Sequence, residues 1–509
     1  YLPVHIQSHF IVYRKRFVQN PELQAYWDTM PMIESYTDSV QRYEAVFTKQ
    51  FGDKGFKWDV YVKTDDLKEF TDYPLLVCPT LLLREKKCPL FKRRSFMHEL
   101  EAYLNDTAGE PVQELYDYLR DETDYPLELI WKNMIRTMHP HDFTRNLALT
   151  RIIEPTVQDA AVAQSLCQNR RIALCMHLYF MDMLGQSRAF AAKFPPQTDV
   201  FITTSSADKK PQIEAAFAGL PVHSVTVTVV ENQGRDVAAF LCDLAPQLRE
   251  YDYACFMHDK KAVQTKPGSV GAGFGYVCNE NVCKNSAHVL NVLCEFEKDP
   301  YLGILCPPYP THGLYFMNMC SGGWGPNFEN TKKLMKDLGL DVPISGEKSP
   351  IAPYGSVFWF RPRALAPLFD HGWKHTDFPP EPLPQDGTIS HAIERIYPFV
   401  AQSAGYYPAV VMSKSYAVTH NDTMQAYASA MIRPLARVFD CTTFYGASSS
   451  AVGFAYKCHH LFSHYGPYSD SQRRHARNWL RDNLPGGSYR VIINTKRAIF
   501  GPHEGPYED

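Results

Sequence analysis

The sequence predicts an α/β protein whose largest domain is a Rossmann-type, mostly parallel β-sheet with helices on both faces. From residue 170 onward, short apolar segments alternate with segments of helical spacing, which is typical of parallel sheets. Apolar residues make up 45% of the 509 residues and charged residues 21%, a composition that can bury several cores. No uninterrupted apolar run reaches the ~18 residues that a membrane-spanning helix needs. We therefore expect several globular domains, a helical connector and a helical C-terminal tail.

The N-terminal part is predicted to mix strands with helices, and residues 76–167 are predicted to form a largely helical connector. Because the chain begins with Tyr1 rather than Met, we expect residues 1–75 to be the last part of a domain that begins upstream. The elements predicted there are strands at 5–13 and 58–62 and helices at 21–30 and 38–51.

The central domain is predicted at residues 168–420, and residues 421–509 are predicted to be mostly helical with a basic end. The β-branched run at 224–230 is typical of a strand. In parallel sheets, ligands bind at the carboxyl ends of the strands, so the residues that end each strand matter most. The predicted strands are 171–179, 199–203, 224–230, 253–257 and 357–360, and the predicted helices are 181–194, 209–218, 237–248 and 388–401.

Charge and cysteine usage narrow the class of protein. The net charge of −3 argues against a nucleic-acid-binding role, because neutralising phosphates needs a basic excess. The 13 cysteines are odd in number and several, such as Cys175 and Cys255, lie in apolar runs, as reduced cysteines do in cytoplasmic proteins. Cys278 and Cys283 lack a second ligand pair at zinc-finger spacing, so no structural zinc is expected.

A short polar motif, Asn232-Gln233-Gly234-Arg235-Asp236, lies between a predicted strand and a predicted helix. The glycine lets the backbone approach a ligand, and the arginine can bind a diphosphate oxygen. The helix N-terminus that follows favours a phosphate. The alternative is a plain helix cap with Arg235 on the surface.

The predicted strand at 253–257 ends abruptly in four polar residues: His258, Asp259, Lys260 and Lys261. Asp259 is the only carboxylate among them and could hold Mg²⁺ or Mn²⁺ on a diphosphate. The two lysines could instead neutralise a leaving diphosphate directly. The alternative is a solvated loop.

With these motifs, the region 168–420 resembles the rhamnan synthesis protein F family. The resemblance implies polysaccharide assembly by glycosyl transfer from a nucleotide sugar, plausibly dTDP-rhamnose, to a lipid-linked glycan acceptor. It also implies a GT-A-like transferase fold. The motifs that carry it are 177–179, 201–204, 232–236, 253–261, 303–305, 355–362, 386–388 and 391–395.

The order of these motifs also looks like that of inverting GT-A transferases. Tyr179 falls where those enzymes place a tyrosine, and Thr203 to Ser205 fall where they carry a nucleotide-binding aspartate, which is missing here. Inversion needs a general base late in the domain. Asp386 is the first candidate, although it could simply be the N-cap of the next helix, and Glu381 is the second.

Further residues extend this prediction. His391 and Arg395, with Glu394, could form an ion cluster near the diphosphate, although a packed histidine is an equal alternative. The glycine-rich segment 268–275 is predicted to be a mobile lid. In residues 1–75, Glu44 would occupy the base position of another transferase domain, although a plain surface acid is nearly as good an interpretation.

The tail carries seven basic residues within 473–497 against one acid, Asp482. A basic amphipathic tail could lie on the inner membrane surface beside a lipid-linked acceptor, or could be an ordinary solvated helix. We therefore expect a cytoplasmic protein, peripheral on the membrane. The second hypothesis on function is a catalytically degenerate glycan-binding or scaffolding subunit, which the missing acid near Thr203 and the lone Asp259 favour.

Overall fold

The structure is a computed structural model that describes residues 4–259, 261, 265–319, 321–384 and 386–439. The chain divides into two compact units, residues 1–95 and residues 96–509. The prediction had placed the first boundary after residue 75 and the start of the central domain at residue 168.

In the described residues of the N-terminal unit, all regular elements are helices. Aromatic rings form its centre, with Phe17 and Phe51 at 4.9 Å and Phe47 and Phe51 at 4.8 Å between centroids. The predicted strands at 5–13 and 58–62 are wrong, since neither segment has a strand partner. Its helices include α1 Lys15–Val18, α2 Pro21–Asp28, α3 Tyr36–Asp38, α4 Ala45–Gly52, α5 Pro74–Val77 and α6 Pro79–Arg84.

The second unit begins with a helical region, as predicted, but this region also supplies an unpredicted strand. Strand β1 (Thr150–Ile153) pairs in parallel with β8 (Tyr407–Ser413). Each helix buries one side of its surface, as Leu115 and Leu119 show in α8. The helices of this region are α7 Arg94–Met97, α8 Pro111–Asp121, α9 Glu128–Thr137, α10 Pro140–Asn146 and α11 Ala160–Asn169.

The central sheet of the second unit has eight strands in the order β1-β8-β6-β7-β5-β2-β3-β4. Every pairing is parallel except those of β7 (Phe358–Phe360), which is antiparallel to both of its neighbours. The predicted α/β class with a mostly parallel sheet is therefore confirmed. The remaining strands are β2 Ile172–His177, β3 Asp199–Thr204, β4 Ser224–Val229, β5 Tyr253–His258 and β6 Leu302–Cys306.

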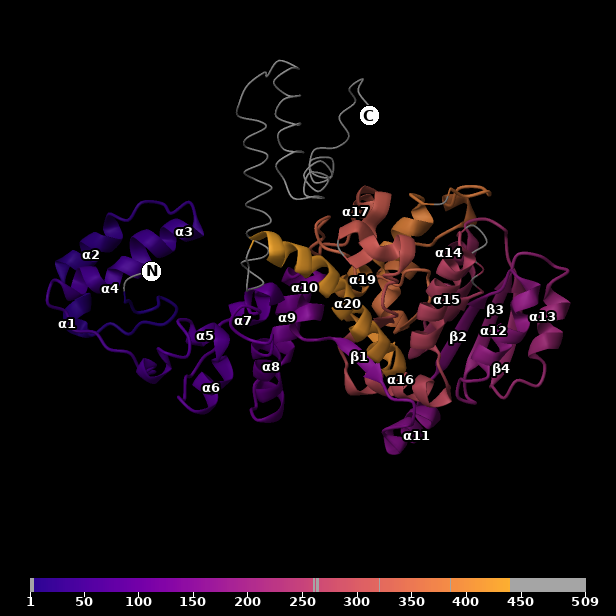
Figure 1. Ribbon diagram of the computed structural model, residues 1–509, viewed down its shortest axis with the longest axis horizontal. Helices are drawn as coiled ribbons and strands as arrows, with labels where there is room; N and C mark the ends of the chain where they lie inside the picture. The colour runs from indigo at the N-terminus through magenta and orange to yellow at the C-terminus, as the bar shows by residue number, and fades with distance from the viewer. Residues whose placement is uncertain (1–3, 260, 262–264, 320, 385, 440–509) are drawn as a thin grey trace, which may run out of the picture. The chain divides into compact units, whose positions relative to one another are not determined.

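Helices cover both faces of this sheet, as predicted (Figure 1). On one face, Phe240 stacks on Phe256 at 4.4 Å, and Tyr397 lies 4.8 Å from Phe358, within one continuous apolar core. On the other face, the indole of Trp359 donates a hydrogen bond to the Val282 carbonyl (2.9 Å). The first face carries α14 Arg235–Ala238, α18 Ala366–Phe369 and α19 Ile389–Ser403, and the second carries α15 Gly268–Val282 and α16 Ser286–Lys298.

Two predicted elements take a different form. The glycine-rich segment 268–275, predicted as a lid, is instead the first half of helix α15, although four of its eight residues are glycine. The helix predicted at 237–248 is a short α14 followed by a π-helical segment, Ala239–Leu244, and a final 3₁₀ turn, Ala245–Gln247.

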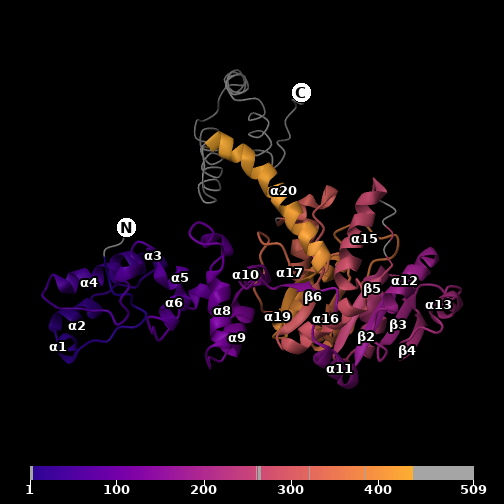
Figure 2. The same cartoon turned by 60° about the horizontal axis from the view of Figure 1, so that its bottom comes forward.

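The other helices of the second unit are α12 Leu184–Ala191, α13 Lys210–Phe217, α17 Phe328–Asp337 and α20 Lys414–Phe439. Helix α20 leaves the end of β8 and extends beyond the sheet (Figure 2). Across the described residues, no helix is both long and apolar enough to cross a membrane. The described cysteines are all free thiols. The basic tail predicted at 471–509 lies outside the described residues.

Candidate functional site

Three adjacent strands end in polar side chains at the carboxyl edge of the sheet. In the strand register, His177 at the end of β2 pairs with Thr203 of β3 on one side and with His258 of β5 on the other. His177 Nδ1 lies 2.9 Å from Thr203 Oγ1. Burial lowers the pKa of His177 to about 4, so this imidazole is neutral at neutral pH. His177, Thr203 and His258 therefore form a polar centre at the carboxyl ends of the parallel strands, where the sequence predicts a ligand site.

Asp259, the residue after β5, holds the turn after β2. Its Oδ2 accepts hydrogen bonds from the backbone nitrogens of Tyr179 (2.7 Å) and Phe180 (2.5 Å). Burial raises the pKa of Asp259, and these two hydrogen bonds oppose that shift because they stabilise the carboxylate. Asp259, which is predicted to contact a metal or a diphosphate, thus binds the backbone of the turn after β2.

Residues Asn232 to Gly234 form a bend that leads into α14, whose first two residues are Arg235 and Asp236. Gly234 has φ +74°, and a Cβ there would lie 2.6 Å from both the Phe378 ring and the Ala238 side chain, so only glycine fits. Arg235 also has a positive φ, +52°. Asp236 Oδ2 lies 3.9 Å from His258 Nε2, which brings this turn to the polar centre at the strand ends.

Arg235 points to the second predicted base. Its Nε lies 3.5 Å from Glu381 Oε1, while the other carboxylate oxygen of Glu381 accepts from the Leu383 nitrogen at 2.9 Å. Both residues are partly exposed. The guanidinium is therefore available at the surface but shares its charge with an acid. Asn232, also predicted, is exposed.

A second chain of polar contacts runs from His258 to α19. His258 Nε2 lies 2.6 Å from the Gly355 carbonyl, and the Gly355 nitrogen donates to Glu394 Oε2 at 2.6 Å. Glu394 is ion-paired with Arg395. Arg395 is buried, its Nε donates to the Gly323 carbonyl (3.0 Å), and its guanidinium lies 4.3 Å from the centroid of the Tyr354 ring. Of the predicted cluster of His391, Glu394 and Arg395, the last two pair inside the protein, whereas His391 lies against Thr388.

Asp386, the first candidate for the base, lies before α19 but does not cap it. The N-cap is Thr388, whose hydroxyl lies 2.8 Å from His391 Nδ1. The Oδ1 atom of Asp386 accepts from the Asn327 amide and from the Gly387 nitrogen, both at 2.7 Å, and lies 3.9 Å from His391 Nδ1. The capping interpretation is therefore wrong.

The surroundings of the other oxygen of Asp386 depend on a glycine. A Cβ at Gly325 would lie 3.1 Å from Asp386 Oδ2, so the missing side chain leaves room beside that oxygen. Arg395 is close enough for the Asp386 charge to act on it, which joins Asp386 electrostatically to the chain of contacts that begins at His258.

The sequence reasoning overlooked Lys209, which follows β3. Its ammonium lies 3.8 Å from the centroid of the Tyr179 ring and donates to the Tyr179 carbonyl at 2.9 Å. Its charge acts on both His177 and Asp259. The basic pair 209–210 at the start of a helix was the available signal. Lys209 brings a cation to the polar centre, where Ser205 is also half-buried.

Of the two lysines predicted after Asp259, Lys261 is described and Lys260 lies outside the described residues. Lys261 pairs with Asp182 at 2.5 Å and lies 5.7 Å from the Phe180 ring. It therefore lies beside the turn that Asp259 holds. In the N-terminal unit, Glu44 accepts from the Ser8 nitrogen at 2.8 Å, a contact within that unit.

The two acids beside the polar centre, Asp259 and Asp236, already have protein partners. Asp259 directs one oxygen at two N–H donors, and Asp236 is oriented toward His258. Within the part of the chain that the structure describes, no three His, Cys, Asp or Glu side chains come together as metal ligands would. The groups at this edge of the sheet that could bind an anionic ligand are cationic side chains.

Comparison with known proteins places this sequence in a family. The sequence profile of rhamnan synthesis protein F matches residues 1–406. The chain belongs to that family. The match covers the N-terminal unit and the helical region as well as residues 168–406 of the region that carries the resemblance. The name of the family ties it to the synthesis of rhamnan, a polysaccharide.

Two curated relatives are also similar to this member of the rhamnan synthesis protein F family. Both are the uncharacterized protein WxcX, from two strains of Xanthomonas campestris pv. campestris. Each is 25% identical over 295 residues, which is 58% of this chain and 39% of WxcX. The chain therefore matches about two fifths of the length of these relatives.

Proposed function

We propose that this chain is a glycosyltransferase with a GT-A-like fold that moves a sugar from a nucleotide-sugar donor to a growing polysaccharide. The observation that carries the proposal is the polar centre of His177, Thr203 and His258 at the carboxyl edge of the sheet, where nucleotides bind in open α/β folds. Membership of the rhamnan synthesis protein F family supports polysaccharide as the product and dTDP-rhamnose as the first donor to test.

The donor diphosphate would lie against the cations around this centre. Lys209 and Lys261 flank the turn after β2, and Arg235 follows the Gly234 turn. Fixed positive charges stabilise the negative charge that develops on a leaving diphosphate. Tyr179 offers an aromatic face beside Lys209 for the base or sugar. Of the remaining predicted donor contacts, Thr203 lies in β3 and Ser205 follows it, Asn232 precedes Gly234, and His391 lies in the first turn of α19.

The acceptor hydroxyl needs a base, and Asp386 is the proposed group. Its Oδ2 takes the hydroxyl proton as the acceptor oxygen bonds to the anomeric carbon. The bond from that carbon to the diphosphate oxygen breaks, and the nucleoside diphosphate leaves with the bonding electron pair. The configuration at the anomeric carbon inverts. Asn327 orients the carboxylate, and the space beside Gly325 admits the hydroxyl. Glu381 is the second candidate.

A second function is favoured by one specific observation. Asp259 is engaged by two backbone N–H groups, as a purely structural residue would be. A degenerate transferase that binds glycan or scaffolds an assembly complex would keep this contact and lose nucleotide binding. Both proposed functions include binding to a lipid-linked glycan at the membrane surface.

Calorimetric titration with dTDP and UDP separates the two proposals. For the enzyme, we expect saturable nucleotide binding that weakens in Arg235→Ala and Lys209→Ala, because these variants remove cations from the proposed diphosphate site. Lys336→Ala, on helix α17, is the matched control and should bind as the wild type does. Glycan binding with no nucleotide binding in the wild-type chain would favour the scaffolding subunit.

A further inference from the structure

A separate pocket lies on the other half of the same sheet edge. Its volume is about 190 Å³, which is below the ~300–1,000 Å³ of pockets for drug-sized ligands and suits a single small ring. Helix α15 contributes Gly273 and Tyr276, the segment after β6 contributes His312, and α20 contributes Tyr416, Thr419 and His420.

The walls of the pocket are aromatic rings. The Tyr416 and His420 rings stack at 5.8 Å with an interplanar angle of 23°, and Tyr276 lies 6.3 Å from Tyr416. A cyclic sugar presents an apolar C–H face that packs on such rings while its hydroxyls seek hydrogen bonds at the rim. This combination distinguishes the pocket from an apolar core gap.

The rings keep polar atoms for a ligand. Among the described residues, the ring nitrogens of His420 and the hydroxyls of Tyr276 and Tyr416 have no hydrogen-bond partner. Burial lowers the pKa of His420, so its neutral imidazole has one donor and one acceptor nitrogen near neutral pH. Sugar hydroxyls, which both donate and accept, match this set.

A glycine shapes the pocket. A Cβ on Gly273 would lie 2.7 Å from His312 Nε2, the atom that also lies 3.0 Å from the Val270 carbonyl. The glycine therefore lets the His312 ring lie against α15, where it closes one side of the pocket. An alanine there would push this ring out of place.

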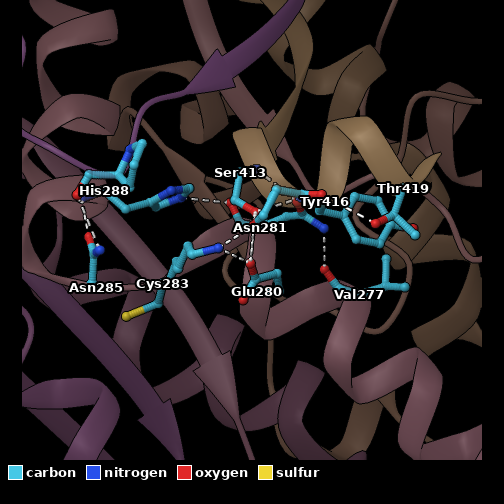
Figure 3. A network of polar contacts seen from close by, with 12 residues as sticks. Val277, Glu280, Asn281, Cys283, Asn285, His288, Ser413, Tyr416 and Thr419 are labelled. Carbon is cyan, nitrogen blue, oxygen red and sulfur yellow. Dashed lines mark hydrogen bonds and ion pairs between the residues drawn. The ribbon is translucent and has the colours of Figure 1, made fainter. Parts of the chain in front are cut away.

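The pocket walls are held rigidly by a polar network (Figure 3). Glu280 Oε1 on α15 accepts from Ser413 Oγ at 2.8 Å and from Ser415 Oγ at 3.0 Å, and Asn281 Oδ1 accepts from the Ser413 nitrogen at 2.9 Å. Figure 3 shows Tyr416 and Thr419 lying beside this network, on the side of Val277. Helix α15 and the start of α20 are thus fixed to the end of β8.

The pocket is close enough to the candidate site for one oligosaccharide to reach both. The pocket lies above β6 and β8, whereas the polar centre lies above β5, β2 and β3. With strands ~4.8 Å apart, β5 and β6 are about 10 Å apart and β5 and β8 about 14 Å. An acceptor glycan could therefore reach from this pocket to the reacting centre.

We infer that the pocket between α15 and α20 is a saccharide subsite that holds one ring of the acceptor glycan. The inference deepens the proposed transferase function, and the role of the glycan as acceptor rests on that function. The binding of a sugar ring rests on the pocket alone.

The test uses the full chain, rhamnan oligosaccharides and the variants Tyr276→Ala and His420→Ala. Tyr276 is 56% exposed, so its truncation should leave folding intact. We expect each variant to raise the dissociation constant for the oligosaccharide about tenfold, as loss of an anchoring aromatic contact does. Nucleotide binding should be unchanged. Tyr61→Ala, a tyrosine 83% exposed in the N-terminal unit, and Val418→Ala, on the exposed side of α20, are the matched controls.

A further variant, Gly273→Ala, tests the pocket by narrowing it and should weaken oligosaccharide binding without removing any ring. Equal oligosaccharide binding by the wild type and all three pocket variants, or no binding by the wild type, would overturn the inference. Transfer that proceeds with an unchanged acceptor KM in the variants also overturns it and leaves the transferase function standing. Pocket-dependent oligosaccharide binding without any nucleotide binding would support the saccharide site and contradict the transferase.

Discussion

The carboxylate of Asp259 lies 2.7 Å from the backbone nitrogen of Tyr179 and accepts its hydrogen bond. The contact ties the end of β5 to the turn after β2, and Phe180 adds a second N–H to the same oxygen. Because Tyr179 lies on this turn and Lys209 donates to its carbonyl, the position of the proposed donor site depends on a residue that does not need to touch the donor.

Replacing Asp259 should therefore affect stability and donor binding together. Asp259→Ala leaves two N–H groups without their acceptor, at a cost of roughly 1–3 kcal/mol for each that stays away from water. We expect a lower free energy of unfolding in urea and a higher donor KM. Asp259→Asn keeps one acceptor oxygen and should be milder. Lost activity at unchanged stability that added Mg²⁺ restores would instead make Asp259 a metal ligand.

The base assignment predicts a different pattern for Asp386. Asp386→Asn removes the proton acceptor but keeps an oxygen for Asn327, so folding should be retained. We expect kcat to fall by about 100-fold or more while the donor KM changes little. Steady-state kinetics measure both. Glu381→Gln is the comparison: the larger effect on kcat identifies the base, and unchanged turnover in Asp386→Asn dismisses Asp386 from that role.

The buried His177 predicts acid sensitivity. Burial lowers its pKa from 6.5 to about 4 in the folded chain. Between these two pH values the unfolded chain binds more protons than the folded chain. The free energy of unfolding therefore has its full value above pH ~6.5 and falls as the pH drops toward ~4. This single group contributes on the order of 3 kcal/mol across that window. His288, whose pKa burial also lowers to about 4, acts in the same direction.

The variant His177→Gln, which carries no charge in either state, isolates this contribution. Urea unfolding at about pH 7 and about pH 5 should show a smaller loss for the variant than for the wild type. The same loss in both proteins would show that His177 is not the source of the acid sensitivity.

The basic tail gives a prediction about membranes. Near an anionic surface each basic residue contributes about 1 kcal/mol, and salt screens this attraction. We expect the full chain to float with anionic liposomes but not with neutral ones, and to be released at high salt. Deletion of residues 471–509 should abolish flotation and spare nucleotide binding. Equal flotation without the tail would assign membrane binding, if present, to another part of the chain.

Strands with strong local signals could be predicted from the sequence. β2, β3, β4 and β5 appear within two residues of their predicted bounds, because long β-branched or apolar runs bury well in a sheet. The strand predicted at 5–13 failed because alternation of apolar and polar residues does not supply a partner strand. Strands β1, β6 and β8 were not predicted: β1 has only four residues, and β6 and β8 contain Gly303 and Pro408, which disfavour strand interiors.

The residues at the strand ends could be identified from the sequence, but their partners could not. The register that aligns His177 with both Thr203 and His258 is a property of the assembled sheet. Likewise, Asp259 contacts a turn about 80 residues earlier, and Glu394 reaches back to Gly355, so proximity along the chain gave no clue. The N-cap of α19 is Thr388, two residues after Asp386, because the Thr388 hydroxyl pairs with His391.

The most direct test of the central claim is transfer itself. The full chain is incubated with dTDP-rhamnose and a lipid-linked oligosaccharide, and products are followed by mass spectrometry. The account predicts an acceptor that gains one deoxyhexose together with release of dTDP, and strongly reduced product with Asp386→Asn. No transfer from dTDP-rhamnose or any other nucleotide sugar, by a chain that is folded and binds the acceptor, would contradict it.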